Sequence, residues 1–188
     1  MSLGTLYSIV WIIWVVSEVL LQIIRRSKKG SIDKDSGSIR KLNAIIYVSV
    51  GVGVFFAFTN IGIIKVQHSI MYLAGIVIII FGLIIRWMAI ITLSKYFTVN
   101  VAILQDHALV QKGLYKHIRH PSYTGLLISF IGIGVGMRNW VSIIFILVPI
   151  TYALINRIII EESALSEAFG DEYKAYSKRT WRLFPGIY

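Results

Sequence analysis

Long apolar runs separated by short polar segments are the feature of this sequence that most limits what the chain can fold into. A helix that crosses a bilayer needs roughly 20 mainly apolar residues, because its backbone polar groups must be satisfied inside the segment itself. Such runs recur here, the mean hydropathy is +0.74, and 15% of the residues are charged. The sequence therefore predicts an all-α integral membrane protein with five transmembrane helices. These are expected at residues 6–24, 42–61, 69–91, 122–136 and 140–160.

The last two apolar runs are joined by only three residues, which predicts a tight C-terminal helical hairpin. Gly132 and Gly136 stand four positions apart in the fourth run and share one face of the predicted helix. Small residues at this spacing let helices approach closely in membranes, so we expect these glycines to serve packing. No glycine-rich turn follows a strand pattern, which excludes a soluble nucleotide-binding fold of the Rossmann type.

Lysine and arginine are distributed unevenly among the predicted loops. They are dense in segments 25–41, 95–119 and 174–182, whereas the opposite side carries Lys65 and Arg138. Positively charged loops stay in the cytoplasm, so we expect the N-terminus outside and the C-terminus inside. The formal net charge of +10 is spread over these loops rather than along one soluble element. This distribution favours membrane lipids as partners and argues against nucleic acid.

Titratable side chains gather in two segments, and the predicted hairpin brings both to the cytoplasmic side. Residues 115–123 open the fourth helix, while Arg157, Glu161 and Glu162 close the fifth. Because Arg157 and Glu161 are four positions apart, they lie on one helical face. Charged residues at this depth usually mark function, which predicts a site where the two segments meet. The alternative is an arginine–glutamate pair that closes a helix end.

Histidines and isolated charges complete the polar inventory. His107, His117 and His120 lie near one another, but their spacing fits neither HExxH nor a zinc finger, and the chain has no cysteine. We therefore predict no metal. Glu18 and Arg86 interrupt apolar runs, and each could belong to a buried pair or reach the membrane interface, so neither is assigned a role.

Two stretches of the C-terminal half resemble the isoprenylcysteine carboxyl methyltransferase family: HALVQKGLYKHIRHPSYTG and, after the hairpin, RIIIEESALSEAFGDEYKAY. The resemblance implies a membrane methyltransferase that uses S-adenosylmethionine and binds it through cytoplasmic segments. The expected reaction is methyl esterification of the carboxylate of a prenylated cysteine or a similar lipid acid. We expect the chain to consist of an N-terminal three-span membrane region, 1–91, and a catalytic region, 92–188, which holds the two-span hairpin and a cytoplasmic tail.

The resemblance implies roles for particular residues. Arg157 corresponds to the arginine that holds the acceptor carboxylate, and Glu161 is expected to take part in catalysis and in cofactor binding. The positions matched to cofactor contacts are Asn100, His107, Ala108, Leu109, Val110, Tyr115, His120, Pro121, Ser122, Tyr123 and Glu161.

Two other readings of the same motifs stay open. In a phospholipid N-methyltransferase, the acceptor amine must lose a proton and Arg157 would meet the lipid phosphate. In a non-enzymatic membrane protein, the motifs would only pack the hairpin. A carboxylate acceptor needs no general base, because its reference pKa of about 4 means that it is already ionised at pH 7.

Overall fold

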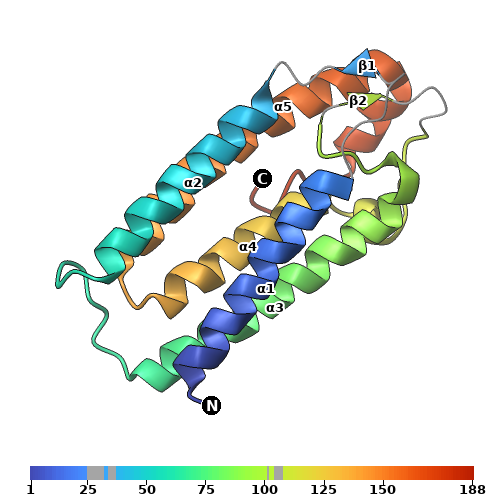
Figure 1. The fold of residues 1–188 in the computed structure, drawn as a ribbon. Helices are drawn as coiled ribbons and strands as arrows, with labels where there is room; N and C mark the ends of the chain where they lie inside the picture. Colours follow the sequence, from blue (N-terminus) through green and yellow to red (C-terminus); the bar gives the residue numbers. More distant parts are fainter. Residues whose placement is uncertain (25–31, 34–36, 101, 104–107) are drawn as a thin grey trace.

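The computed structural model describes residues 1–24, 32–33, 37–100, 102–103 and 108–188. Within these residues the chain is a bundle of long helices (Figure 1). Its elements are α1 (Leu3–Ile24), β1 (Ile32–Asp33), α2 (Ser38–Ala57), α3 (His68–Leu93), η1 (Ser94–Tyr96), β2 (Ala102–Ile103), η2 (Gly113–Lys116), α4 (Pro121–Gly136) and α5 (Trp140–Lys178). The two-residue antiparallel pair of β1 and β2 is the departure from a purely α-helical expectation.

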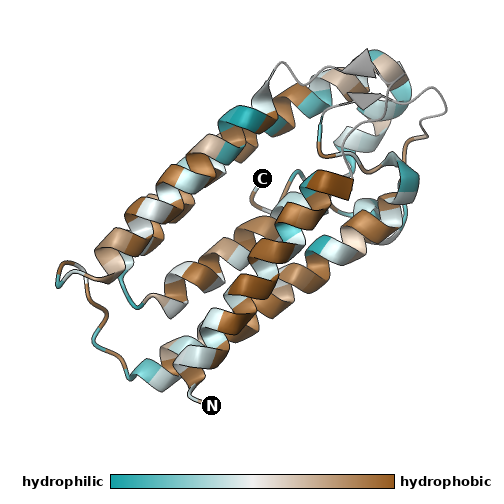
Figure 2. Ribbon diagram, in the orientation of Figure 1, coloured by the Kyte–Doolittle hydropathy of each residue, from teal (hydrophilic) through white to brown (hydrophobic). Residues whose placement is uncertain are grey.

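Four described helices, α1, α2, α3 and α5, are long and apolar enough to cross a membrane. Helix α4 has 16 residues. At a rise of about 1.5 Å per residue it is roughly 24 Å long, shorter than a hydrocarbon core of about 30 Å. Figure 2 shows hydrophobic residues along the helices and more hydrophilic ones toward their ends. The helical architecture is confirmed, and α4 as a fifth crossing stays a prediction.

Helix α5 is longer than the apolar run that predicted it. We expected it to end at residue 160, but it continues to Lys178, with a break at Gly170, where φ is 52°. The segment after residue 160 contains several Glu, Ala and Leu residues, which favour helix, so the helix continues beyond the apolar run. A positive φ is accessible to glycine without a Cβ penalty, and this allows the chain to change direction at Gly170.

Helix α2 begins and ends earlier than the expected range 42–61. It starts at Ser38, so Arg40 and Lys41 belong to the helix rather than to the preceding loop. Long basic side chains can run along apolar surface while their charges stay in water, which permits them near the end of a membrane helix.

Helix α4 packs chiefly on α3, and α5 packs chiefly on α2 (Figure 1). The α3–α4 contact is close because glycines face it from both sides. A Cβ at Gly132 would lie 2.8 Å from the carbonyl oxygen of Gly75, and one at Gly125 would lie 2.6 Å from that of Gly82. The predicted packing role of Gly132 is therefore confirmed, and the helix that it packs against is α3.

Candidate active site

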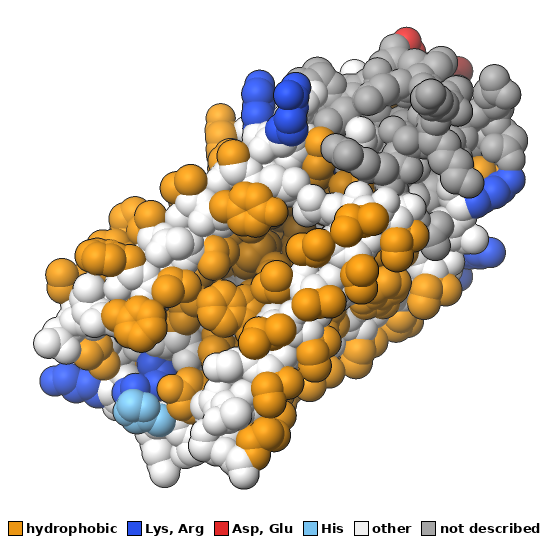
Figure 3. Space-filling view, in the orientation of Figure 1, with side chains coloured by type: hydrophobic (Ala, Val, Ile, Leu, Met, Phe, Trp, Pro, Cys, Tyr) orange, Lys and Arg blue, Asp and Glu red, His pale blue; other side chains and the backbone are white. Residues whose placement is uncertain are grey.

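A cavity of about 370 Å³ lies at the end of the bundle where α1 and α3 end and α2 and α4 begin. Its volume falls in the range of about 300–1,000 Å³ that small-molecule sites occupy. Toward the middle of the bundle its walls are apolar side chains of α1 and α2, among them Trp11, Val15, Leu42 and Ile46. Figure 3 shows this face hollowed between the two helices, with hydrophobic side chains around the hollow.

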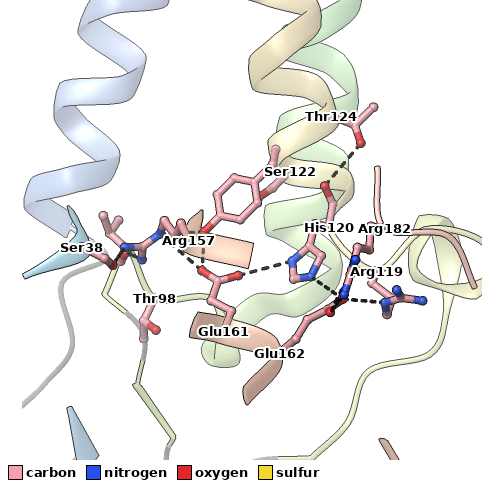
Figure 4. Close-up of polar contacts among 12 residues, drawn as sticks. Ser38, Thr98, Arg119, His120, Ser122, Thr124, Arg157, Glu161, Glu162 and Arg182 are labelled. Carbon is pink, nitrogen blue, oxygen red and sulfur yellow. Dashed lines mark hydrogen bonds and ion pairs between the residues drawn. The ribbon is translucent and has the colours of Figure 1, made fainter. Parts of the chain in front are cut away.

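The polar end of the cavity is built around Arg157, whose side chain is 2% exposed. Its Nε donates to the hydroxyl oxygen of Tyr123 at 2.8 Å, and its Nη1 donates to Ser38 Oγ at 2.7 Å (Figure 4). Its Nη2 donates to the carbonyl oxygen of Val99. One arginine therefore joins α5 to α4, to the start of α2 and to the segment after η1.

Glu161 lies one helical turn after Arg157 and shares Tyr123 with it. The Tyr123 hydroxyl donates to Glu161 Oε1, and Glu161 Oε1 also lies 3.4 Å from Arg157 Nε. The tyrosine hydroxyl thus receives a hydrogen bond from a cation and gives one to a carboxylate. This arrangement keeps the two charges close while Tyr123 holds both in fixed directions.

His120 stands between Glu161 and Glu162. Its Nδ1 lies 3.3 Å from Glu161 Oε2 and its Nε2 lies 3.4 Å from Glu162 Oε1, an ion-pair contact without the geometry of a hydrogen bond. Burial alone lowers the pKa of His120, but the two facing carboxylates outweigh burial and raise the pKa above its ordinary value. The ring also stacks on Tyr123, with centroids 5.7 Å apart. The positively charged form of His120 is therefore favoured.

Glu162 does not line the cavity but anchors the C-terminal segment behind it. Arg119 Nε donates to Glu162 Oε1 at 2.8 Å, and Arg182 Nη2 lies 2.8 Å from Glu162 Oε2 (Figure 4). Backbone bonds add to this anchor, since His120 N donates to the carbonyl oxygen of Arg182 at 3.0 Å. Thr180 accepts a further bond from Arg119. The network holds residues 117–120 in place at the start of α4.

Most of the residues assigned from the sequence meet in this cavity. Pro121 is buried in the first turn of α4 but does not line the cavity, and His107 lies outside the described residues. The assigned residues that line it are Asn100, Ala108, Leu109, Val110, Tyr115, His120, Ser122, Tyr123, Arg157 and Glu161.

The sequence did not reveal several members of the site. Ser38 and Val99 contact Arg157 from segments with no motif of their own, and no local signal marks them. Arg119 could have been noticed because it directly precedes His120 and follows the basic pattern of the loop. Glu18 and Arg86, left open above, form a two-point ion pair, with Arg86 Nη2 2.6 Å from Glu18 Oε2.

The donors and acceptors of the cavity fit a ligand that carries both an aromatic ring system and charged or hydroxyl groups. Tyr115, Tyr173 and Tyr176 supply aromatic walls, and Glu161 supplies an anion. The Tyr173 hydroxyl is buried and has no hydrogen-bond partner among the described residues. A buried donor of this kind is satisfied when a ligand offers an acceptor, so the residues present suit a polar cofactor.

The chain is similar to proteins of one family. The model of the isoprenylcysteine carboxyl methyltransferase family matches residues 74–167, a segment that contains every residue assigned to the site from the sequence. Protein-S-isoprenylcysteine O-methyltransferase B of Arabidopsis thaliana is 38% identical over 115 residues, covering 60% of this chain and 58% of the plant protein. The Dictyostelium discoideum protein-S-isoprenylcysteine O-methyltransferase is 36% identical over 116 residues, covering 61% and 49%.

A solved structure shares the fold as well. It is that of the eukaryotic intramembrane Ras methyltransferase ICMT, which is 28% identical with a TM-score of 0.58 and matches 81% of this chain and 53% of its own. The chain thus spans about half to three fifths of the length of these relatives. The matched segment covers half of the 188 residues and holds the whole assigned site, and the chain belongs to the isoprenylcysteine carboxyl methyltransferase family.

Proposed function

We propose that this protein is an S-adenosylmethionine-dependent carboxyl O-methyltransferase that esterifies the carboxylate of a prenylated cysteine or a similar lipid acid. One observation carries the proposal. A single cavity contains both an apolar part and the polar cluster of Arg157, Tyr123 and Glu161. We call the apolar part, which is lined by Trp11, Val15, Leu42 and Ile46 of α1 and α2, the apolar channel. A lipid acid has the same division, with an apolar tail and a charged head.

The two ends of the cavity suit two different reactants. The apolar end, with Trp11 and Ile46, would take the lipid tail directly from the bilayer. The polar end would hold the cofactor, with Tyr115 and Leu109 against its base and Glu161 near its ammonium or hydroxyl groups. The names of the relatives, protein-S-isoprenylcysteine O-methyltransferases, support a lipidated cysteine as the acceptor.

Arg157 is the residue best suited to hold the acceptor carboxylate. Its planar guanidinium can bind a carboxylate through two parallel hydrogen bonds, in a way that a lysine cannot. In the structure its terminal nitrogens donate to neutral oxygens of Ser38 and Val99. A carboxylate adds a full negative charge and a second parallel hydrogen bond to the contact with the guanidinium, so it can replace these neutral partners.

The reaction requires the two reactants to be aligned but requires no proton transfer from the acceptor. When bound, S-adenosylmethionine supplies a methyl group on a positively charged sulfur. Arg157 would hold a carboxylate oxygen in line with this methyl group, Glu161 and Tyr115 would hold the cofactor, and transfer of the methyl to the carboxylate would leave a neutral thioether on the cofactor. Alignment of the two reactants and exclusion of water together can lower the activation barrier by several kcal/mol. Orientation alone can contribute up to about 7–11 kcal/mol.

We further propose that the site faces the cytoplasm, with the N-terminus of the chain outside. The end of the bundle that carries the site also carries the basic segments 37–41 and 112–119, while Lys65 and Arg138 lie at the other end. This distribution agrees with the tendency of positive loops to stay in the cytoplasm. A reporter fused after Tyr188 that works only when exported would be inactive in this orientation.

Methyl transfer by the purified protein tests the proposed function. Labelled S-adenosylmethionine is supplied with a prenylcysteine analogue or, separately, with phosphatidylethanolamine, and the product is treated with base. We expect label in the prenylcysteine product and its release by base, as for an ester. Label in the phospholipid that survives base would instead identify an N-methyltransferase, and no label in either would point to a non-enzymatic protein.

Single variants at Arg157 and Glu161 refine the test. Arg157→Ala should lose turnover while cofactor affinity stays nearly intact, because the arginine serves the acceptor. Glu161→Ala should weaken cofactor binding by roughly tenfold to a hundredfold, the effect of about 1.5–3 kcal/mol for a lost charge-assisted contact. Calorimetry gives the cofactor dissociation constants, and thermal melting gives the stabilities. Equal losses of cofactor binding and stability in both variants would support a purely structural pair.

A further inference from the structure

A second arginine, Arg86, lines the same cavity from α3, and all three of its guanidinium nitrogens are engaged. Its Nε and Nη2 donate to the two carboxylate oxygens of Glu18 on α1, with 2.6 Å between Nη2 and Oε2. Its Nη1 donates to the carbonyl oxygen of Ser122, in the first turn of α4, at 3.0 Å. Glu18 therefore covers most of the hydrogen-bonding face that Arg86 could offer to another carboxylate.

The arginines that line the cavity in the described part of the chain each face one glutamate. Arg119 pairs with Glu162, and Arg86 pairs with Glu18 at two points. Arg157 meets Glu161 at 3.4 Å through a single nitrogen and shares Tyr123 with it. Glu18 therefore meets Arg86 through two nitrogens, whereas Glu161 meets Arg157 through one.

An Arg86 without Glu18 would compete for the substrate. Glu18 itself lines the cavity, on the same face of α1 as Val15 and Gln22, so its removal would expose the guanidinium of Arg86 to the channel. Arg86 lines the same cavity as Arg157 and Tyr115, so a lipid acid that entered the cavity would bring its head group to a wall that includes Arg86.

We propose that Glu18 is a specificity-determining residue that, by occupying Arg86, directs the acceptor carboxylate to Arg157. This inference rests on the proposed function, since it concerns where the lipid acid places its charge. A carboxylate held by Arg86 would sit against α1 and α3, whereas the productive position is beside α5. Glu18 belongs to a helix outside the matched segment 74–167, so the N-terminal helix contributes to the choice of binding position.

Four variants separate this role from a structural one: Glu18→Gln, Arg86→Gln, the double variant Glu18→Gln/Arg86→Gln, and the exposed control Asp171→Asn. The kcat and KM are measured for the prenylcysteine analogue, together with inhibition by its uncharged methyl ester. In Glu18→Gln we expect kcat to fall about tenfold or more while KM stays level or falls, because Arg86 retains the acid unproductively. Inhibition by the methyl ester should not change.

The double variant is the decisive comparison, because it removes both charges. Its kcat should exceed that of Glu18→Gln by about threefold or more, since the competing cation is gone. Equal losses of kcat in the two variants, with a raised KM, would mean that the pair only holds α1 to α3 and would overturn the inference. Thermal melting checks the fold of each variant.

Glu18→Gln leaves the buried Arg86 without its counter-ion, so this variant can fail to fold. Glu18→Asp then replaces it, because aspartate keeps the charge but is too short for the full two-point contact. The same fall in kcat at level KM is expected to a smaller extent, and a raised KM would again overturn the inference. A wild-type protein that methylates no lipid acid would instead remove the proposed function, and this inference with it.

Discussion

Removal of one oxygen atom from Tyr123 tests the geometry of the polar cluster most directly. In Tyr123→Phe the ring that stacks on His120 is kept, but the hydroxyl that accepts from Arg157 and donates to Glu161 is lost. Arg157 Nε and Glu161 Oε1 already lie 3.4 Å apart, so the two charges can approach and pair directly. A direct pair recovers part of the lost energy and draws the arginine toward Glu161, away from the acceptor.

The expected cost follows from the two bonds. Each involves a charged partner and contributes about 1.5–3 kcal/mol, and the new direct pair compensates for roughly one of them. The remaining loss of about 1.5–3 kcal/mol corresponds to a fall in kcat/KM of roughly 10- to 150-fold. The assay is labelled methyl transfer to a prenylcysteine analogue, with cofactor affinity measured separately by calorimetry.

A matched tyrosine elsewhere on the same helices provides the control. Tyr152 on α5 is 66% exposed, so Tyr152→Phe removes a hydroxyl of the same kind away from the cavity. This control should keep the kcat/KM of the wild type. A Tyr123→Phe variant whose kcat/KM stays within about twofold of the control would refute the reasoning that this hydroxyl orients both charges.

Three further outcomes follow from the packing and the charges. Gly125→Ala should lower the free energy of unfolding by about 1–3 kcal/mol in thermal melts, because its Cβ would meet the α3 backbone at 2.6 Å, while Gly51→Ala, with open space, should not. Glu162→Gln should lower the free energy of unfolding by about 1.5–3 kcal/mol and open the C-terminal segment to proteolysis, since its part-buried contact with Arg119 loses its charge. The pKa of His120 is raised in the folded state, so its contribution to stability is full below about pH 6.5 and is lost as the pH rises through the folded pKa. The melting temperature of the wild type should therefore fall above that pH more steeply than that of His120→Asn.

The chemistry of the site was predictable where it rests on local spacing. Arg157 and Glu161 are four positions apart on a helix, and Tyr123 follows the proline that begins α4, so three of the central residues could be placed from the sequence. The meeting of these segments followed from a short connection between two apolar runs. Helical periodicity and chain length were sufficient for this part because both act over few residues.

The remaining contacts depend on how the helices rotate and which pairs of helices meet. Glu18 and Arg86 are 68 positions apart, and nothing local indicates that α1 and α3 present these two charges to each other. The contact of Ser38 with Arg157 also depends on the pairing of α2 with α5, which the expected hairpin did not include. In lipid, helix pairing is decided by close packing of small residues rather than by apolar area, so an apolar run alone does not name its partner.

The N-terminal helices α1 and α2 form part of the cavity wall and therefore contribute to the site as well as to membrane insertion. The matched segment 74–167 supplies the polar cluster, but Trp11, Val15 and Glu18 of α1 supply one wall of the channel. Gln22 of α1 and Asn43 of α2 exchange two hydrogen bonds, at 3.0 and 3.3 Å, near the polar end of that wall. A lipid acid that entered between these helices would pass apolar side chains first and meet charged groups only where arginines already face glutamates. A carboxylate that bound Arg86 would have to displace the ionised side chain of Glu18 from a two-point contact, whereas at Arg157 it can displace the neutral oxygens of Ser38 and Val99.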